Sequence, residues 1–142
     1  MRLYLDTSAL VKLYVNEEGA GVVRGASDQA DVITTSALAY AEARSAFSRR
    51  RQEGALSVGE YRRVVHDLDE DWPRYLTIQV VESLIHEAAR LAEAYRLRAY
   101  DAIHLASAAT ANREIGLPVV FASWDGPLER AARREGLDLL VR

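Results

Sequence analysis

At 142 residues, with 49% hydrophobic and 27% charged residues, the chain has the size and composition of one ordinary folded domain. It has no cysteine, which excludes a disulfide scaffold, a thiolate zinc site and a cysteine nucleophile. The formal net charge of -3 excludes attraction of nucleic acid by a basic overall field, so any such binding must depend on local patches.

The first part of the chain predicts a strand, two short helices and a second strand. Residues 2–5 are a short apolar run typical of a buried strand, and residues 9–14 continue with apolar side chains at helical spacing. A break at residues 16–19 precedes a small helix at residues 20–26. Residues 31–35 are apolar and β-branched, which favours a buried parallel strand.

Two long helices follow the second strand. Ser36 is predicted to cap the first of them, which covers residues 37–53 and ends at Gly54. The pattern predicts the next helix at residues 58–71.

The third strand is predicted at residues 76–81, before two further helices. The first of these helices covers residues 82–95. The second covers residues 101–114, and Gly116 and Pro118 are expected to end it.

The last part of the chain predicts a fourth strand at residues 119–122, a helix at residues 128–135 and a strand at residues 137–141. Short apolar strands that alternate with longer helices are typical of a parallel sheet covered on both faces. We therefore expect residues 1–142 to form a single α/β domain, a three-layer α/β/α sandwich with a central parallel sheet of about five strands. The first residues lack the basic start and apolar stretch of a signal peptide, and no apolar run is long enough to span a membrane, so we expect a cytoplasmic protein.

Four carboxylates stand out by their positions in this pattern. Asp6 follows the first strand, Asp125 follows the fourth, Asp101 opens a helix, and Glu42 lies on the apolar stripe of its helix. If they meet at one end of the sheet, their charges repel one another unless a cation is bound between them. Oxygen ligands alone suit Mg²⁺ or Mn²⁺, and such an ion can activate water for attack on a phosphodiester.

Each acid also has a structural interpretation. The three aspartates could cap helices or complement helix dipoles, and Glu42 could form a salt bridge with an arginine. His104, one turn beyond Asp101, is predicted to be a structural histidine.

Four segments of the chain resemble the PIN domain, and specifically the VapC-type ribonuclease toxins of toxin–antitoxin pairs. The segments are "LYLDTSALVKLY", "TSALAYAEARSAF", "RAYDAIHLASA" and "VVFASWDGPLERAAR", in the order and at the spacing of that family. The resemblance covers nearly the whole chain.

The resemblance implies that Asp6, Glu42, Asp101 and Asp125 are the catalytic metal-binding acids of an endoribonuclease that uses Mg²⁺ or Mn²⁺. It implies that the Ser8 hydroxyl supports the first aspartate. Ser123 stands where many relatives carry threonine, and it keeps the hydroxyl. The resemblance also implies an RNA substrate, a homodimer and a cognate VapB-like antitoxin that covers the acidic pocket.

Arginines supply nearly all of the positive charge, because Lys12 is the only lysine in the chain. The run Arg49, Arg50 and Arg51 is a candidate RNA-binding patch, since guanidinium groups pair well with phosphate; a solvated helix face is the alternative. A late lysine is needed in aspartyl-phosphate enzymes, and its absence here disfavours that class. A non-catalytic RNA- or protein-binding PIN-like module remains the alternative function.

Overall fold

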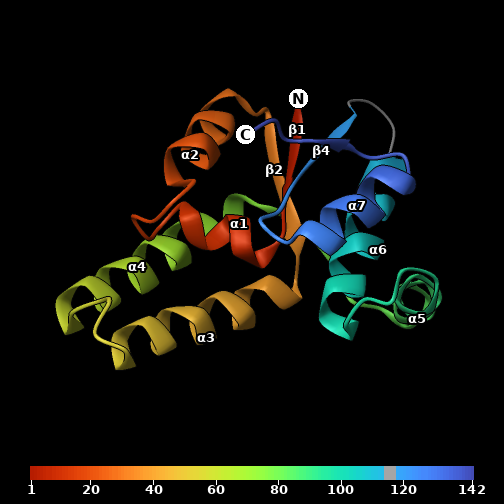
Figure 1. Ribbon diagram of the computed structural model, residues 1–142. Helices are drawn as coiled ribbons and strands as arrows, with labels where there is room; N and C mark the ends of the chain where they lie inside the picture. The colour runs from red at the N-terminus through yellow and green to blue at the C-terminus, as the bar shows by residue number, and fades with distance from the viewer. Residues whose placement is uncertain (114–117) are drawn as a thin grey trace.

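The computed structural model describes residues 1–113 and 118–142 of the chain (Figure 1). Its five strands are β1 (Arg2–Leu5), β2 (Val32–Ser36), β3 (Leu76–Ile78), β4 (Val119–Ala122) and β5 (Asp138–Leu139). Its helices are α1 (Thr7–Lys12), α2 (Ala20–Gln29), α3 (Leu38–Gln52), α4 (Val58–Asp71), the 3₁₀ helix η1 (Trp72–Arg74), α5 (Glu82–Tyr95), α6 (Ala99–Arg113) and α7 (Gly126–Arg134).

The strands form one parallel sheet in the order β3-β2-β1-β4-β5. Side chains alternate between the two faces of β1. Leu3 and Leu5 pack in the core cluster that contains α1 to α4, while Tyr4 packs in the cluster that contains α5, α6 and α7. The two groups of helices lie on opposite faces of the sheet (Figure 1). The predicted three-layer α/β/α sandwich is confirmed.

The order of the strands reverses between β1 and β4. From β1 the chain moves outward through β2 to β3, then returns to the other side of β1 for β4 and β5. The Asp6 amide, just after β1, donates a 3.1 Å hydrogen bond to the carbonyl of Ala122 at the end of β4. Ligands of open parallel sheets bind at such a reversal, beside the carboxyl ends of the strands.

Several predicted elements have the bounds expected from the sequence. The strands at Arg2–Leu5 and Val119–Ala122 and the helices at Val58–Asp71 and Glu82–Tyr95 agree residue for residue. Gly54 has the left-handed φ of 84° that a residue ending a helix often adopts. The predicted end of a helix at Glu114, and Gly116 after it, lie outside the described residues.

Other bounds differ because of neighbouring structure. The strand predicted at residues 76–81 stops at Ile78, since its partner β2 ends at Ser36, the residue paired with Ile78. The strand predicted at residues 137–141 is reduced to the two residues paired with β4. Ser36 belongs to β2 and Ala37 is the N-cap of α3, although the Ser36 hydroxyl still accepts a 3.2 Å hydrogen bond from the Leu38 amide.

The helix predicted to open at Asp101 begins two residues earlier, at Ala99. Arg96 takes a left-handed conformation with φ of 55° and ends α5, and the amide of Ala102 already bonds to the carbonyl of Arg98. Asp101 therefore lies in the first turn of α6. Among the described residues, no helix is long and apolar enough to cross a membrane.

Gly19 is constrained by both its backbone and its surroundings. Its φ is +87°, and a Cβ at this position would lie 2.6 Å from Cζ2 of Trp124.

We expect Gly19→Ala to lower the free energy of unfolding by about 2–4 kcal/mol, because the left-handed conformation and the overlap each cost about 1–2 kcal/mol. Urea denaturation measures the loss. Gly54→Ala is the control, because the φ of Gly54 is +84° and no atom lies within 4 Å of the added Cβ. This variant should lose only the stability that the left-handed conformation costs. Equal losses would show that the Trp124 contact contributes nothing.

Candidate active site

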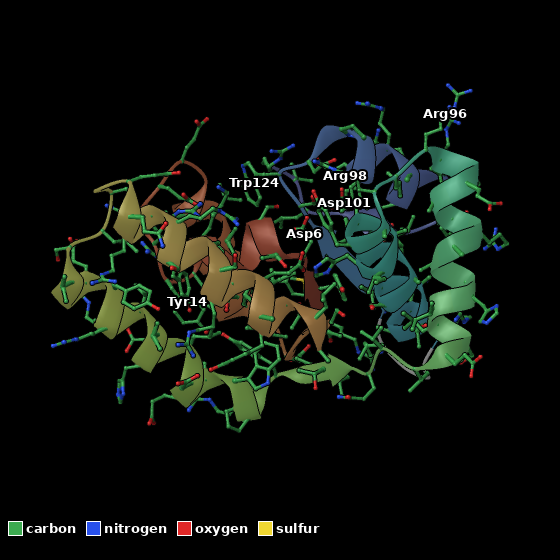
Figure 2. All side chains as sticks on the ribbon, turned by 90° about the horizontal axis from the view of Figure 1, so that it is seen from below. Asp6, Tyr14, Arg96, Arg98, Asp101 and Trp124 are labelled. Atoms are coloured by element: carbon green, nitrogen blue, oxygen red, sulfur yellow. The ribbon has the colours of Figure 1, made fainter. Side chains whose placement is uncertain are left out.

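A cavity of about 700 Å³ opens at the carboxyl ends of β1 and β4. Figure 2 shows Asp6 and Asp101 on neighbouring elements that border it. The cavity is lined by α1, α3, α6 and the segment after β4. Among its polar side chains are Asp6, Thr7, Ser8, Lys12, Glu17, Glu42, Arg49, Arg50, Arg98, Asp101, His104 and Asp125.

Asp6 is buried, with 4% of its surface exposed, and its carboxylate is held on both oxygens. Oδ1 accepts hydrogen bonds from the Ser8 hydroxyl at 2.6 Å and the Ala9 amide at 2.9 Å, while Oδ2 accepts one from the Ser123 hydroxyl at 2.6 Å. Burial raises the pKa of Asp6 above its ordinary value, and the bonds from Ser123 and Ser8 oppose that rise. Asp6 thus caps α1 and keeps one fixed orientation.

The two serines join the segments on either side of Asp6. The Ser8 hydroxyl also accepts a 3.0 Å hydrogen bond from the Trp124 amide, and the Ser123 hydroxyl accepts one of 3.0 Å from the Asp125 amide. Each hydroxyl therefore donates to Asp6 and accepts from the segment that follows β4. Both serine hydroxyls therefore contact the Asp6 carboxylate, and their part in the function stays a prediction.

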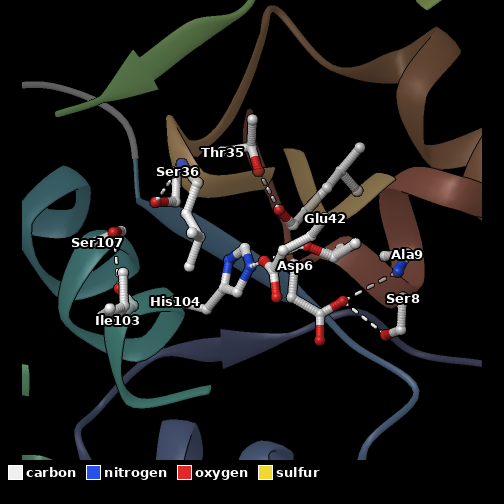
Figure 3. Close-up of polar contacts among 12 residues, drawn as sticks. Asp6, Ser8, Ala9, Thr35, Ser36, Glu42, Ile103, His104 and Ser107 are labelled. Carbon is white, nitrogen blue, oxygen red and sulfur yellow. Dashed lines mark hydrogen bonds and ion pairs between the residues drawn. The ribbon is translucent and has the colours of Figure 1, made fainter. Parts of the chain in front are cut away.

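Glu42 projects from α3 toward α1 and α6. Its Oε1 accepts a 2.7 Å hydrogen bond from the Thr7 hydroxyl and lies 2.8 Å from Nε2 of His104 (Figure 3). Burial acts to raise the pKa of Glu42, but the interactions with His104 and Thr7 outweigh it and hold the pKa below its ordinary value. The partner of Glu42 is thus a histidine, and the alternative of a salt bridge between Glu42 and an arginine is wrong.

His104 is fixed by a second hydrogen bond on the far side of its ring. Nδ1 lies 2.8 Å from the Tyr4 hydroxyl, and only 2% of His104 is exposed. Because the Glu42 carboxylate can only accept, Nε2 of His104 carries the hydrogen that they share. Tyr4, His104 and Glu42 form a hydrogen-bonded chain from the core of the sheet to the cavity.

Asp101 and Asp125 border the cavity from α6 and α7. The pKa of Asp101 is raised to about 6, first by burial and then by the negative charges of Asp125 and Asp6. The guanidinium of Arg98, 3.8 Å away, only partly offsets this. Asp125 is the N-cap of α7 and accepts a 2.9 Å hydrogen bond from the Leu128 amide. Repulsion among the three aspartates is therefore already present in the site.

The four acids fit a hard cation by chemistry but do not form a finished coordination shell. Across residues 1–113 and 118–142, no three histidine, aspartate or glutamate side chains gather closely enough to hold an ion as they stand. Glu42 is turned toward His104, and both Asp6 oxygens carry hydrogen bonds. The oxygen-only donor set suits Mg²⁺ or Mn²⁺, and small movements of the side chains would have to accompany the binding of such an ion.

The comparison with known proteins identifies the family. The family profile described as "PIN domain" matches residues 3–133. This chain belongs to the PIN-domain family. Two relatives from Mycobacterium tuberculosis, Ribonuclease VapC45 and Ribonuclease VapC49, are each 33% identical over 135 residues, which cover 94% of this chain and 91% of theirs. Ribonuclease VapC47 from the same species is 31% identical over 138 residues, which cover 94% of this chain and 92% of that protein. The predicted resemblance to VapC ribonucleases is confirmed.

Solved structures confirm the fold. FitAcB from Neisseria gonorrhoeae superposes with a TM-score of 0.65 at 18% identity, covering 98% of this chain and 96% of the other. FitAB bound to an IR36 DNA fragment gives the same score and identity, covering 96% of this chain and 92% of the other. At this identity the likeness shows the PIN fold alone.

Two of the four acids of this PIN domain follow strands, and two come from helices. Asp6 and Asp125 follow β1 and β4, whereas Asp101 and Glu42 project from α6 and α3. Asp101 reaches the cavity from the first turn of α6. All four nevertheless line the same cavity, because α3 and α6 begin near the carboxyl ends of the strands.

The arginine run is split by the geometry of α3. Arg49 and Arg50 line the cavity, but Arg51 is not among its lining residues and lies over the ring of Tyr61, 5.6 Å from the centroid. Successive residues of a helix point about 100° apart, so three in a row cannot share one face.

Sequence reasoning missed Thr7 and the pairing of His104. Thr7 follows Asp6 directly and bonds to Glu42, a residue 35 positions away. A threonine at the start of a helix is common, so the local sequence around Thr7 could not predict its hydrogen bond to Glu42.

Proposed function

We propose that this PIN domain is a metal-dependent endoribonuclease, the toxin of a toxin–antitoxin pair. The observation that carries the proposal is the meeting of Asp6, Glu42, Asp101 and Asp125 on one cavity where the strand order reverses. The relatives named Ribonuclease VapC support the reaction class, and the oxygen-only donor set supports Mg²⁺ or Mn²⁺.

The residues have distinct roles in this proposal. Asp6 presents a fixed carboxylate, since two serine hydroxyls and a backbone amide hold it. Asp101 and Asp125 provide two further carboxylates from α6 and from the N-cap of α7, and Glu42 completes the set with the oxygen that His104 and Thr7 do not engage. A divalent ion held by these carboxylates would supply the charge that activates water and stabilises a phosphodiester during hydrolysis. No side chain is required as a nucleophile.

The proposal includes two partners. By resemblance to VapC proteins, we propose a homodimer and a cognate VapB-like antitoxin that covers the acidic cavity. Static light scattering of the purified chain measures the first, and co-purification with the protein encoded beside it measures the second.

The test of the nuclease is cleavage of a panel of purified RNAs by antitoxin-free protein. The reactions contain Mg²⁺, Mn²⁺ or EDTA, and Asp101→Asn is purified identically to control for contaminating nuclease. We expect cleavage only with metal and only by the unmodified chain. RNA binding that persists in EDTA and in Asp101→Asn, without cleavage under any condition, would instead support the non-catalytic binding module.

The split of the arginine run gives a prediction for RNA binding. We expect Arg49→Gln and Arg50→Gln each to weaken binding of a single-stranded RNA and to reduce the slope of log K against log salt by about 0.7. Arg51→Gln is the matched control, with the same change of charge outside the cavity. Fluorescence anisotropy from 50 to 300 mM KCl measures the three slopes. If all three variants have the same slope, the cavity arginines make no specific contact with RNA and the run is a solvated helix face.

A further inference from the structure

Lys12 is the only lysine in the chain, and it is buried in the wall of the cavity. Its residue is 8% exposed, which is unusual for lysine. The ammonium lies 5.0 Å from the centroid of the Trp124 ring and 3.3 Å from Oε1 of Glu17. An aromatic face and an acid therefore hold the ammonium in one place.

Glu17 also engages a second cation. Its carboxylate lies 3.1 Å from Nη2 of Arg50, whose other terminal nitrogen donates to the carbonyl of Ala46. Glu17 belongs to the segment between α1 and α2, whereas Lys12 and Arg50 are fixed on helices. One anionic group thus bridges two cations inside the cavity, and it is the one member of the three that a helix does not hold.

The two cations lie at some distance from the acids along the same walls. On α1, Ser8 and Lys12 are four residues apart, and on α3, Glu42 and Arg50 are eight residues apart, so each pair shares a face of its helix. Eight residues of helix span roughly 12 Å. The cavity therefore has a carboxylate end and a cationic end, and a nucleic-acid strand lying along it would have one phosphate cut and another beside the cations.

We infer that Lys12 and Arg50 bind a second backbone phosphate on the same RNA strand as the one that is cut, and that Glu17 occupies this subsite in the free protein. The inference rests on the proposed function for the identity of the ligand. A phosphodiester carries one negative charge on two free oxygens, as a carboxylate does, so it replaces Glu17 without leaving either cation unpaired. RNA must then displace Glu17, which weakens binding.

The sign of the effect at Glu17 separates this role from a structural ion pair. We expect Glu17→Gln to tighten binding of a labelled single-stranded RNA in EDTA by about five-fold, because the neutral side chain no longer competes with the RNA for the two cations. The change corresponds to about 1 kcal/mol in the free energy of binding. Glu18→Gln is the matched control, because Glu18 is the adjacent exposed acid and its loss changes the net charge equally. We expect it to change the affinity less than two-fold. Lys12→Gln should weaken binding. Unchanged or weaker binding by Glu17→Gln overturns the inference.

The single lysine provides a readout that does not depend on RNA. In protein labelled with ¹⁵N only in lysine, the side-chain ammonium gives one NMR signal, which can be followed as inorganic phosphate is added. We expect the signal to shift at lower phosphate concentration in Glu17→Gln than in the unmodified chain or in Glu18→Gln. If no variant binds RNA but this order holds, the subsite stands and the proposed substrate is wrong. If RNA is cut while phosphate moves the signal alike in all three, the nuclease stands and the subsite is overturned.

Discussion

Replacing Asp101 by asparagine is expected to slow RNA cleavage strongly and, without metal at pH 7, to make the protein more stable. Asp101 is repelled by Asp125 and Asp6 within the cavity, and asparagine removes that repulsion while keeping the shape of the side chain. Loss of one carboxylate from the acidic set should reduce the rate by about 10²–10³-fold. The gain in stability is about 1 kcal/mol after allowance for solvent screening, or about 3 °C in Tm.

The dependence on pH gives the same prediction a sharper form. The pKa of Asp101 rises from 3.8 to about 6 on folding, so the folded state binds the proton more tightly than the unfolded state. The free energy of unfolding therefore contains a stabilising contribution from protonated Asp101 that is complete below pH 4 and is lost as the pH rises through 6. The advantage of Asp101→Asn should therefore be absent at pH 4 and complete at pH 7. Thermal unfolding in EDTA across this range measures it.

Added metal should reverse the order of stability. We expect Mg²⁺ or Mn²⁺ to bind the unmodified chain better, because the ion would offset the repulsion that Asp101→Asn has removed. The Tm of the unmodified chain should rise with metal concentration at pH 7, and that of the variant should rise much less. A variant that is less stable than the unmodified chain at pH 7 in EDTA would mean that the contact with Arg98 outweighs the repulsion.

The sequence was informative where a short local pattern has one structural outcome. An acid directly after an apolar strand, as at Asp6, has to lie at the edge of the sheet where the chain turns. Glu42 on an alanine-rich stripe has to face the interior, because residues three and four apart share a face of a helix. The strands and most helices followed from the same local periodicity.

Features that depend on distant residues could not be derived in this way. The bond between Glu42 and His104 joins positions 62 apart, and that between Tyr4 and His104 joins positions 100 apart. The start of α6 depends on the left-handed conformation of Arg96, which is uncommon for a residue other than glycine. The pairing of Glu17 with Lys12 and Arg50 depends on how α1 packs against α3.

Replacing Glu42 by glutamine is expected to separate the chemistry of the site from its structure. The amide oxygen of glutamine can accept the hydrogen bonds that Thr7 and His104 donate to Oε1, so the fold should keep its Tm within about 2 °C. The cavity loses a negative charge, and cleavage should fall by about 10²-fold or more. Single-turnover cleavage and thermal unfolding of the same preparations measure the two effects. A large loss of stability would show that the hydrogen bond between Glu42 and His104 is chiefly structural.

Two variants of His104 then show what the histidine contributes to Glu42. His104→Gln places an amide nitrogen near the position of Nε2 and keeps a donor for Glu42, so cleavage should remain within about ten-fold of the unmodified chain. His104→Leu removes the donor and leaves the buried Tyr4 hydroxyl without its partner, which costs about 1–3 kcal/mol of stability. Its cleavage should fall by about 10–100-fold, because Glu42 loses its fixed orientation. Combining His104→Leu with Tyr4→Phe should recover part of the stability but none of the cleavage. Recovery of both would mean that His104 acts through the stability of the core and does not orient Glu42.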